Sequence, residues 1–164
     1  MRFNPTDETS AAEIVNRYAE RELADLIFEY GEERASRRIA RAIVYARPIS
    51  TATQLAQVIE KALGRRGRIH PATRAFQALR IAVNRELEAL DKVLPQILDT
   101  LSPEGRAVII SYHSFEDRRV KNFFRSTDEW QVLTKHPLTP AEDEIRNNPR
   151  ARSAKLRASE KIVL

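Results

Sequence analysis

Hydrophobic residues in the first seventy positions recur every three or four residues, in short runs separated by capping and breaking residues. This spacing predicts amphipathic helices that each turn one apolar stripe inward. Ser10 and Glu13 have the spacing of a capping box, and Gly31 is expected to end the second helix as its C′ residue. The first predicted helix begins after Ser10, and three more span 20–30, 33–47 and 51–63. Together they predict a compact helical unit.

The pattern changes after residue 70. An apolar stripe from Phe76 to Leu90 predicts one long helix from Ala72 toward Leu94, which Pro95 breaks or kinks. Shorter segments follow and alternate in type, with strands at 106–112, 130–134 and 154–163 and helices at 115–125 and from 139. This order predicts an α/β fold, half of a wound sheet with helices on both faces and one unpaired apolar edge.

The run from Arg106 to Ile110 is dominated by valine and isoleucine, and polar residues follow it at once. Such a run predicts a strand buried on both faces, as in a parallel sheet. Ligands of open α/β sheets lie beyond the carboxyl ends of the strands, so His113, Ser114 and Asp117 are candidate site residues. The structural alternative is that Ser114 caps the next helix and that Asp117 forms a surface ion pair with Arg118.

The formal net charge is +5 and the pI is near 9.8, which suits a polyanionic partner. A soluble basic protein with solvated charges has the same composition. Two groups of arginines could distinguish a polyanion-binding protein from a basic protein with solvated charges. In the first case they contact phosphates, and in the second they are exposed to solvent. One surrounds Gly67 in a predicted loop and consists of Arg65, Arg66 and Arg68. The other recurs at helical spacing and consists of Arg34, Arg37, Arg38 and Arg41.

Composition also excludes several classes of site. The chain has no cysteine, so disulfides and thiolate metal sites are excluded, and its three histidines do not have metal-ligand spacing. We therefore expect no metal. No run of 18 apolar residues occurs, and the first eight residues do not form a signal peptide. We expect a cytoplasmic protein that does not contact a membrane.

Five stretches together resemble the RsmH (MraW) family, bacterial methyltransferases that modify cytosine N4 in small-subunit (16S) rRNA. The stretches are 11–16, 30–43, 70–84, 110–118 and 148–157, the last reading Asn-Pro-Arg-Ala-Arg-Ser-Ala-Lys-Leu-Arg. The resemblance covers nearly the whole chain but only the C-terminal portion of the family. It implies a Rossmann-like methyltransferase sheet interrupted by an all-α domain. The implied division is a connecting segment at 1–8, an inserted helical domain at 9–69 and the C-terminal part of the methyltransferase domain at 70–164.

The resemblance also implies the chemistry. The cofactor is S-adenosylmethionine, whose binding segments lie in the preceding half of the family, so no cofactor-binding residue is expected in this chain. Small-subunit rRNA is the implied substrate, and a missing N-terminal half or a second chain would complete the sheet. His113 and Ser114 would lie at the pocket rim, with Asp117 or Arg118 behind them. RNA would contact Arg65, Arg66, Arg68, Arg74, Gln77, Arg150 and Arg152.

Three hypotheses remain open from the sequence. The chain is part of a methyltransferase that is inactive alone, from a truncated gene, a split gene or a miscalled start. Alternatively it is a standalone rRNA-binding or assembly module without catalysis, or a remnant that folds poorly. The match of the strand end and loops to the catalytic family favours the first hypothesis.

Overall fold

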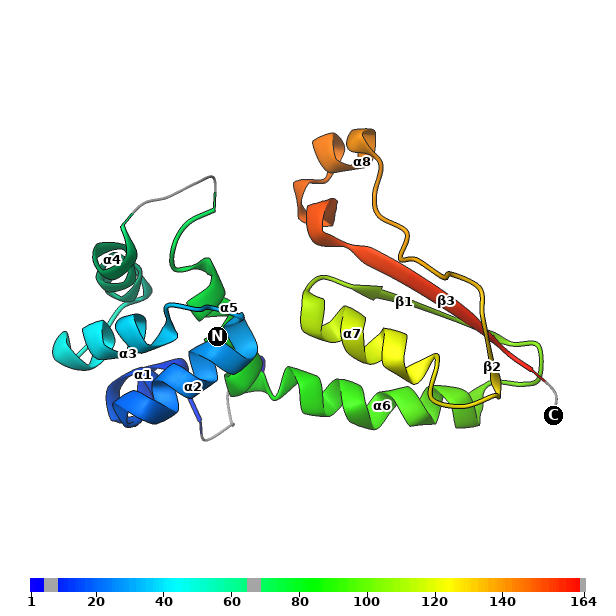
Figure 1. The fold of residues 1–164 in the computed structure, drawn as a ribbon, viewed down its shortest axis with the longest axis horizontal. Helices are drawn as coiled ribbons and strands as arrows, with labels where there is room; N and C mark the ends of the chain where they lie inside the picture. Colours follow the sequence, from blue (N-terminus) through cyan, green and yellow to red (C-terminus); the bar gives the residue numbers. More distant parts are fainter. Residues whose placement is uncertain (5–8, 65–68, 163–164) are drawn as a thin grey trace. The chain divides into compact units, whose positions relative to one another are not determined.

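The computed structural model describes residues 1–4, 9–64 and 69–162, and the chain divides into two compact units, Met1–Glu86 and Leu87–Leu164 (Figure 1). No helix within the described ranges is long and apolar enough to cross a membrane. The boundary at residues 69 and 70, between the inserted helical domain and the methyltransferase domain of the family, stays a prediction. By contacts alone, the unit boundary falls at Glu86 because the helix after residue 70 packs into the helical unit.

The first unit is helical, as the pattern predicts. Ser10 Oγ accepts a hydrogen bond from the Glu13 backbone N–H at 3.1 Å, and Thr51 Oγ1 accepts one from Gln54 N–H at 3.1 Å. These two N-caps satisfy backbone donors that a helix start leaves free. The helices are α1 (Ala11–Arg17), α2 (Glu20–Gly31), α3 (Ser36–Tyr45), α4 (Ala52–Leu63) and α5 (Thr73–Asn84).

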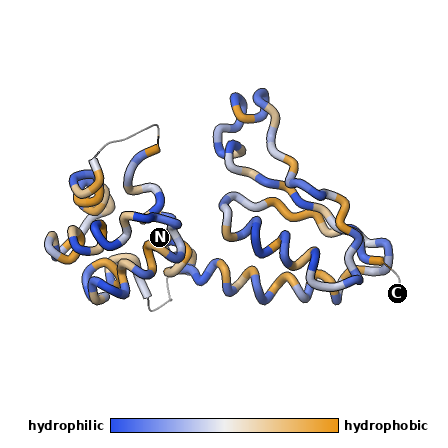
Figure 2. Tube along the Cα trace, in the orientation of Figure 1, coloured by the Kyte–Doolittle hydropathy of each residue, from blue (hydrophilic) through white to orange (hydrophobic). Residues whose placement is uncertain are grey.

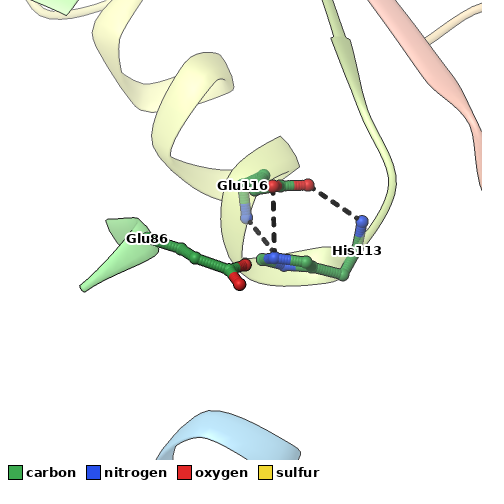
Figure 3. A group of neighbouring side chains, drawn as sticks. All are labelled: Glu86, His113 and Glu116. Carbon is green, nitrogen blue, oxygen red and sulfur yellow. Dashed lines mark hydrogen bonds and ion pairs between the residues drawn. The ribbon is translucent and has the colours of Figure 1, made fainter. Parts of the chain in front are cut away.

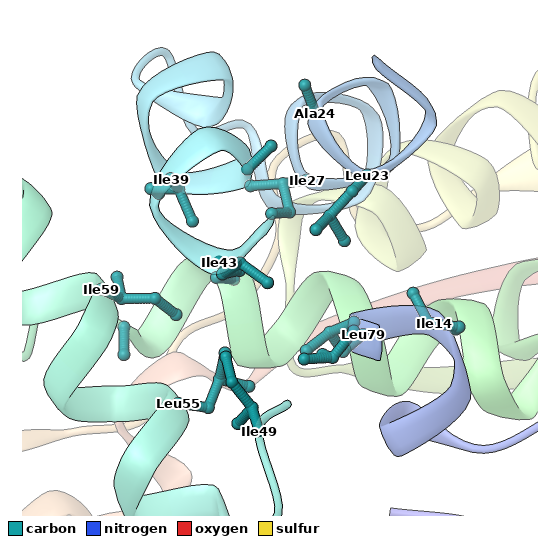
Figure 4. Packing of buried hydrophobic residues seen from close by; sticks show 14 of the residues in the cluster. Ile14, Leu23, Ala24, Ile27, Ile39, Ile43, Ile49, Leu55, Ile59 and Leu79 are labelled. Carbon is teal, nitrogen blue, oxygen red and sulfur yellow. The ribbon is translucent and has the colours of Figure 1, made fainter. Parts of the chain in front are cut away.

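The core of this unit is a cluster of aliphatic side chains drawn from all five helices (Figure 4). The side chains of Leu23, Ile27, Ile39, Ile43 and Leu79 are fully buried. Burial of such side chains is the main source of stability for a unit of this size. It fixes which face of each helix remains exposed to solvent.

Gly31 has a different role from the predicted helix-ending one. The left-handed residue that ends α2 is Glu32, with φ of 49°, whereas Gly31 is buried within the helix. A Cβ at position 31 would lie 2.7 Å from the backbone oxygen of Arg74 on α5. Glycine is needed here because the backbones of α2 and α5 approach too closely for any side chain.

The predicted long helix is wrong in one respect, since it is broken at Arg85 rather than at Pro95. Arg85 has a left-handed backbone with φ of 48° and ends α5, and α6 (Glu86–Thr100) begins at the next residue. Pro95 lies within α6. The apolar stripe therefore serves two cores, with Leu79 and Val83 in the first unit and Leu94 in the second.

The second unit contains a three-stranded sheet among its described residues, in the order β1-β3-β2. Strands β1 (Arg106–Ser111) and β2 (Trp130–Val132) each pair antiparallel with β3 (Lys155–Lys161). The predicted parallel sheet is therefore wrong, although β1 and β2 run parallel to each other because β3 lies between them. The pattern indicates strands but not their directions. It therefore missed that the last strand returns through the middle.

One face of this sheet is covered and the other is open. α6 and α7 (Ser114–Phe123) lie on one side of the sheet (Figure 1), where Ala107 and Trp130 join the second core. On the opposite face Val108 is 58% exposed and Ile110 is 53% exposed. Both belong to the hydrophobic stretch of β1 that Figure 2 colours orange. The prediction of a strand buried on both faces is wrong, as is that of helices on both faces among the described residues.

The segment between β2 and β3 contains two short helices. α8 (Glu142–Asn147) has Ala141 at its N-cap, without a side-chain hydrogen bond, so the predicted cap at Thr139 falls two residues early. The predicted basic loop after it is a 3-10 helix, Pro149–Ser153. Ala151 is buried and holds this turn against the unit.

Candidate functional site

The predicted catalytic residues, His113, Ser114 and Asp117, lie where β1 ends and α7 begins. His113 is the N-cap of α7, and its Nδ1 accepts a hydrogen bond from the Glu116 backbone N–H at 3.3 Å. Glu116 returns the contact, because its Oε2 accepts the backbone N–H groups of Tyr112 at 2.8 Å and His113 at 3.2 Å (Figure 3). This is a capping box with histidine in the place usually taken by serine or threonine.

The cap corrects one prediction and specifies one tautomer. Ser114 is the first residue within α7, so it is His113 and not Ser114 that caps the helix. Because Nδ1 of His113 accepts a hydrogen bond, the hydrogen-bond network assigns the ring proton to Nε2. His113 Nε2 lies 3.3 Å from Glu116 Oε1, and the His113 side chain is 7% exposed. The imidazole is therefore held on both sides by the same glutamate.

Glu116 is half-buried, and its ionisation is set by this cap. Burial alone would raise the pKa of the Glu116 carboxyl, but the side-chain hydrogen bond with His113 and the backbone N–H of Tyr112 outweigh it. The net result is a pKa below the usual range for glutamate. The carboxylate is therefore charged at neutral pH and sits at the positive end of the α7 dipole.

Asp117 forms a buried ion pair with a residue of β3. Arg157 Nε donates to Asp117 Oδ1 at 2.7 Å, and Arg157 Nη2 donates to Asp117 Oδ2 at 3.2 Å. Lys155 Nζ lies 3.7 Å from Oδ2. Asp117 is 9% exposed and Arg157 is 6% exposed. The alternative of a surface pair with Arg118 is wrong, because Asp117 is buried and its carboxylate is bound by Arg157. The Arg118 guanidinium carbon lies 5.7 Å from the centre of the Phe115 ring.

Burial would raise the pKa of the Asp117 carboxyl, but the hydrogen bonds and charge of Arg157, with the charge of Lys155, outweigh it and hold the pKa below its usual range. Both carboxylate oxygens have basic partners, which lowers the proton affinity that a general base needs. The arrangement is suited to positioning the start of α7 against β3. Among the three predicted residues, only the His113 ring and the Ser114 hydroxyl remain candidates for contact with a substrate.

The remaining predicted residues fall into three places. Arg150 and Arg152 are exposed on either side of buried Ala151 and form no hydrogen bond or ion pair with described residues. Arg74 and Gln77 lie on α5 in the first unit, where Arg74 Nη1 contacts Glu33 Oε2 at 3.7 Å and the Glu32 carbonyl at 3.4 Å. Arg74 therefore caps the carbonyl of Glu32, the residue that ends α2. The predicted loop residues Arg65, Arg66 and Arg68 lie outside the described residues.

The sequence did not reveal the partners that complete the site. Glu116, Lys155 and Arg157 were not predicted, although Glu116 stands three residues after His113 at capping-box spacing. Histidine is an uncommon N-cap, so the signal was weak. Arg157 is separated from Asp117 by forty residues, and only the register of β3 against β1 brings it to this end of the sheet.

The described residues offer limited means of holding a cofactor or metal. None of the described glycines lies between a strand and a helix, where nucleotide-type cofactors are bound, because Gly31 and Gly64 stand at the ends of α2 and α4 and Gly105 precedes β1. The His113 ring and the Glu116 carboxylate are possible metal ligands, but both are engaged in the cap. Figure 3 also draws Glu86, which ends the first unit and accepts two hydrogen bonds from Arg80 within it.

Comparison with known proteins identifies the family. Residues 1–162 match the model of the MraW methylase family. The chain is 54% identical over 166 residues to a protein named ribosomal RNA small subunit methyltransferase H from Synechococcus elongatus, covering 99% of this chain and 56% of that protein. The protein of the same name from Acidobacterium capsulatum is 57% identical over 169 residues, with 98% and 56% covered.

A further relative with this name, from Dehalococcoides mccartyi, is 50% identical over 182 residues, covering 99% of this chain and 52% of that protein. The chain belongs to the MraW methylase family. It spans about half the length of the curated relatives that it matches. The resemblance seen in the sequence, and its restriction to part of the family, are both confirmed.

Proposed function

We propose that this chain is the substrate-side part of a methyltransferase that modifies cytosine N4 in small-subunit rRNA, with S-adenosylmethionine as the methyl donor. The observation that carries the proposal is the match of residues 1–162 to the family, at 54% to 57% identity with two relatives named as rRNA methyltransferases. S-adenosylmethionine is implied by the family. Because no described glycine forms a strand-to-helix turn, we infer that the donor is held by a part of the protein outside this chain.

The open face and free edge of β1 support the inference that the chain is incomplete alone. Ala107 to Ile110 carry neither a charge nor a proline, and β1 has β3 as its only ladder partner among described residues. Native proteins normally protect such an edge with charges, prolines or a covering element. An exposed apolar edge in a chain half as long as its relatives therefore fits a sheet that further strands complete.

The exocyclic amine of cytosine is a poor nucleophile, so the enzyme must position it and accept the proton that it loses. Within this chain, the Asp117–Arg157 pair and the His113–Glu116 cap fix the loop between β1 and α7. His113 and Ser114 then face the base, and Arg150 and Arg152 bind phosphates. The protein is cytoplasmic in this proposal and does not act on a membrane.

The test is to supply the part that the chain lacks. The chain is mixed with the remaining segment of the Synechococcus elongatus relative, and transfer of a labelled methyl group to small ribosomal subunits is measured. We expect transfer by the mixture, mapped to N4-methylcytidine by mass spectrometry, and none by either piece alone. A Val108→Lys, Ile110→Lys variant should fold normally but neither associate with the segment nor support transfer, because it charges the open face.

The alternative function is a standalone rRNA-binding or assembly module. It is favoured by the self-contained core of the first unit, which needs no part of the sheet. Association with the segment and RNA binding, without any methyl transfer, would support this alternative. Methyl transfer by the chain alone would contradict the proposed division between donor and substrate parts.

A further inference from the structure

We propose that the exposed face of α3 binds single-stranded RNA, with Arg34, Arg37, Arg38 and Arg41 on phosphates and Tyr45 stacked on a base. We call these five residues the arginine face. The proposal rests on the proposed function for its choice of RNA, but it concerns a surface that the predicted site does not include. It is a surface of the first unit alone.

The face is built by the way α3 is packed. Ile39, Ala40 and Ile43 are fully buried, so they fix the orientation of the helix. At 100° per residue, Arg37, Arg38, Arg41 and Tyr45 fall within an arc of about 100° on the opposite side. Arg34 lies in the turn that leads into the helix, and all five side chains are exposed.

The charges of the face are largely uncompensated. Arg34, Arg37 and Arg38 form no ion pair or hydrogen bond with described residues, and Arg41 Nε contacts only Glu20 Oε1, at 3.4 Å. No acidic residue occurs between Arg34 and Ile59. The neighbouring helices differ, because Arg17 and Arg21 each pair with a carboxylate four residues away, Glu13 and Asp25.

Ordinary solvated helix faces mix the two signs of charge, as α1 and α2 do, whereas a face of one sign attracts an oppositely charged polymer. Tyr45 adds the feature that distinguishes a nucleic acid from other polyanions. Tyr45 is 92% exposed and lies on the same side of α3 as the arginines, so packing in the core does not account for its position. Exposed aromatics beside basic residues bind unstacked bases in single-stranded RNA.

A hollow adjoins the face and extends it. Arg38 lines this hollow together with His70 and Arg74. Among the described residues that line it, Glu33 is the one carboxylate, and it is already held by Arg74 Nη1 at 3.7 Å and by the Ala35 backbone N–H at 2.9 Å. His70 Nε2 lies 3.8 Å from Glu60 Oε2, so Arg38 is the residue that continues the positive surface into the hollow, where a further phosphate of the RNA would bind.

The experiment measures binding of the purified chain to a labelled single-stranded oligoribonucleotide by fluorescence anisotropy, over a series of salt concentrations. The triple variant Arg34→Gln, Arg37→Gln, Arg38→Gln should lower the slope of log Kd against log salt by about 2, since each phosphate contact on a single strand contributes about 0.7. We expect affinity to fall about tenfold or more at roughly 0.1 M salt. The matched control, Arg17→Gln with Arg21→Gln, removes exposed arginines outside the face and should leave the slope unchanged.

Tyr45→Ala should weaken binding by roughly fivefold or more without changing the salt slope, and Tyr45→Phe should restore it, because stacking needs the ring and not the hydroxyl. Circular dichroism confirms that every variant is folded. An unchanged slope in the triple variant, or equal losses in the control, would overturn the proposal. So would equally tight, salt-dependent binding of poly-glutamate, which would identify an acidic protein as the partner.

The outcome is separable from that of the proposed function. If the arginine face binds RNA but the reconstituted mixture transfers no methyl group, the proposed function fails and this inference stands. If the mixture is active and the triple variant retains its salt slope, only the arginine face is wrong.

Discussion

Replacing Asp117 by asparagine should destabilise the second unit far more than the loss of an exposed ion pair would. The change keeps the shape of the side chain but removes its charge. Arg157, which is only 6% exposed, then has a buried positive charge without a carboxylate partner. Breaking a buried ion pair by removing one partner costs roughly 3–5 kcal/mol. The amide oxygen of the introduced asparagine still accepts one hydrogen bond, so we expect a loss of about 3 kcal/mol in the free energy of unfolding.

The matched control is Glu160, which lies on β3 like Arg157, the partner of Asp117. Arg106 Nε and Glu160 Oε2 lie 2.7 Å apart, as close as the Asp117 contact, but the Arg106 side chain is 68% exposed. Glu160→Gln should therefore cost less than about 1 kcal/mol, because solvent screens exposed charges. The shortest contact is equally long in the two pairs, but the Asp117–Arg157 pair is buried and has a second hydrogen bond at 3.2 Å, so the comparison tests burial and bidentate geometry together.

The assay uses the single tryptophan of the chain. Trp130 is 6% exposed within the second core, with ring centres of Phe123 and Phe124 at 5.6 and 5.2 Å. Its fluorescence during urea unfolding therefore reports the second unit and not the first. Far-ultraviolet circular dichroism, to which the helices of the first unit contribute strongly, supplies the complementary signal.

The pH dependence follows from the lowered pKa of Asp117. Because the carboxyl has a lower pKa in the folded state, the pair stabilises fully above the unfolded value of about 3.9 and is lost as pH falls through the folded value. The difference between wild type and Asp117→Asn should shrink only below about pH 4. A loss no larger than that of Glu160→Gln at neutral pH, or one that stays constant down to strongly acidic pH, would refute the buried-pair argument.

Two further predictions concern the other structural features. Gly31→Ala should destabilise the first unit by about 1–3 kcal/mol, because the new methyl would lie 2.7 Å from the Arg74 carbonyl oxygen; thermal unfolding followed by circular dichroism tests it, and an unchanged midpoint would contradict the close approach. His113→Ala should cost about 1 kcal/mol by loss of the α7 cap, and His113→Asn should recover most of it, since asparagine is a preferred N-cap. If His113→Asn restores stability but not methyl transfer in the reconstituted mixture, the ring has a role beyond capping. Recovery of both would leave the cap as its whole contribution.

Sequence periodicity was sufficient for the helical unit but not for the sheet. The three-to-four-residue spacing of apolar residues predicted one buried face for each helix, because an amphipathic helix reveals its inward side locally. Leu23, Ile27, Ile39 and Ile43 are accordingly buried. The direction of a strand leaves no such local signal. The Val-Ile run of β1 has the composition of a strand covered on both faces, yet Val108 and Ile110 are exposed among the described residues. That disagreement is itself informative, since it marks the face that further structure would cover.

The predicted catalytic residues lie together at the strand end, where the structure gives His113 and Asp117 structural contacts that the sequence did not predict. Polar residues after β1 predicted a site at the strand end, and His113, Ser114 and Asp117 do gather there. What they contact depends on Glu116 and on Arg157. The first was within reach of capping rules, had histidine been considered as an N-cap. The second could not be predicted, because it requires the register between β1 and β3.

These roles change what the resemblance to the methyltransferases can prove. The match at residues 110–118 was the sequence feature that favoured retained catalysis. The structure gives His113, Glu116 and Asp117 structural reasons to be there, since they cap α7 and anchor it to β3. A chain that had lost catalysis would still need them in order to fold. The match at Arg150 and Arg152 discriminates better, because these side chains are exposed and support nothing among the described residues. Exposed arginines suit contact with phosphate as well as with solvent, so that turn is a sharper place than the strand end to test the proposed RNA-modifying function.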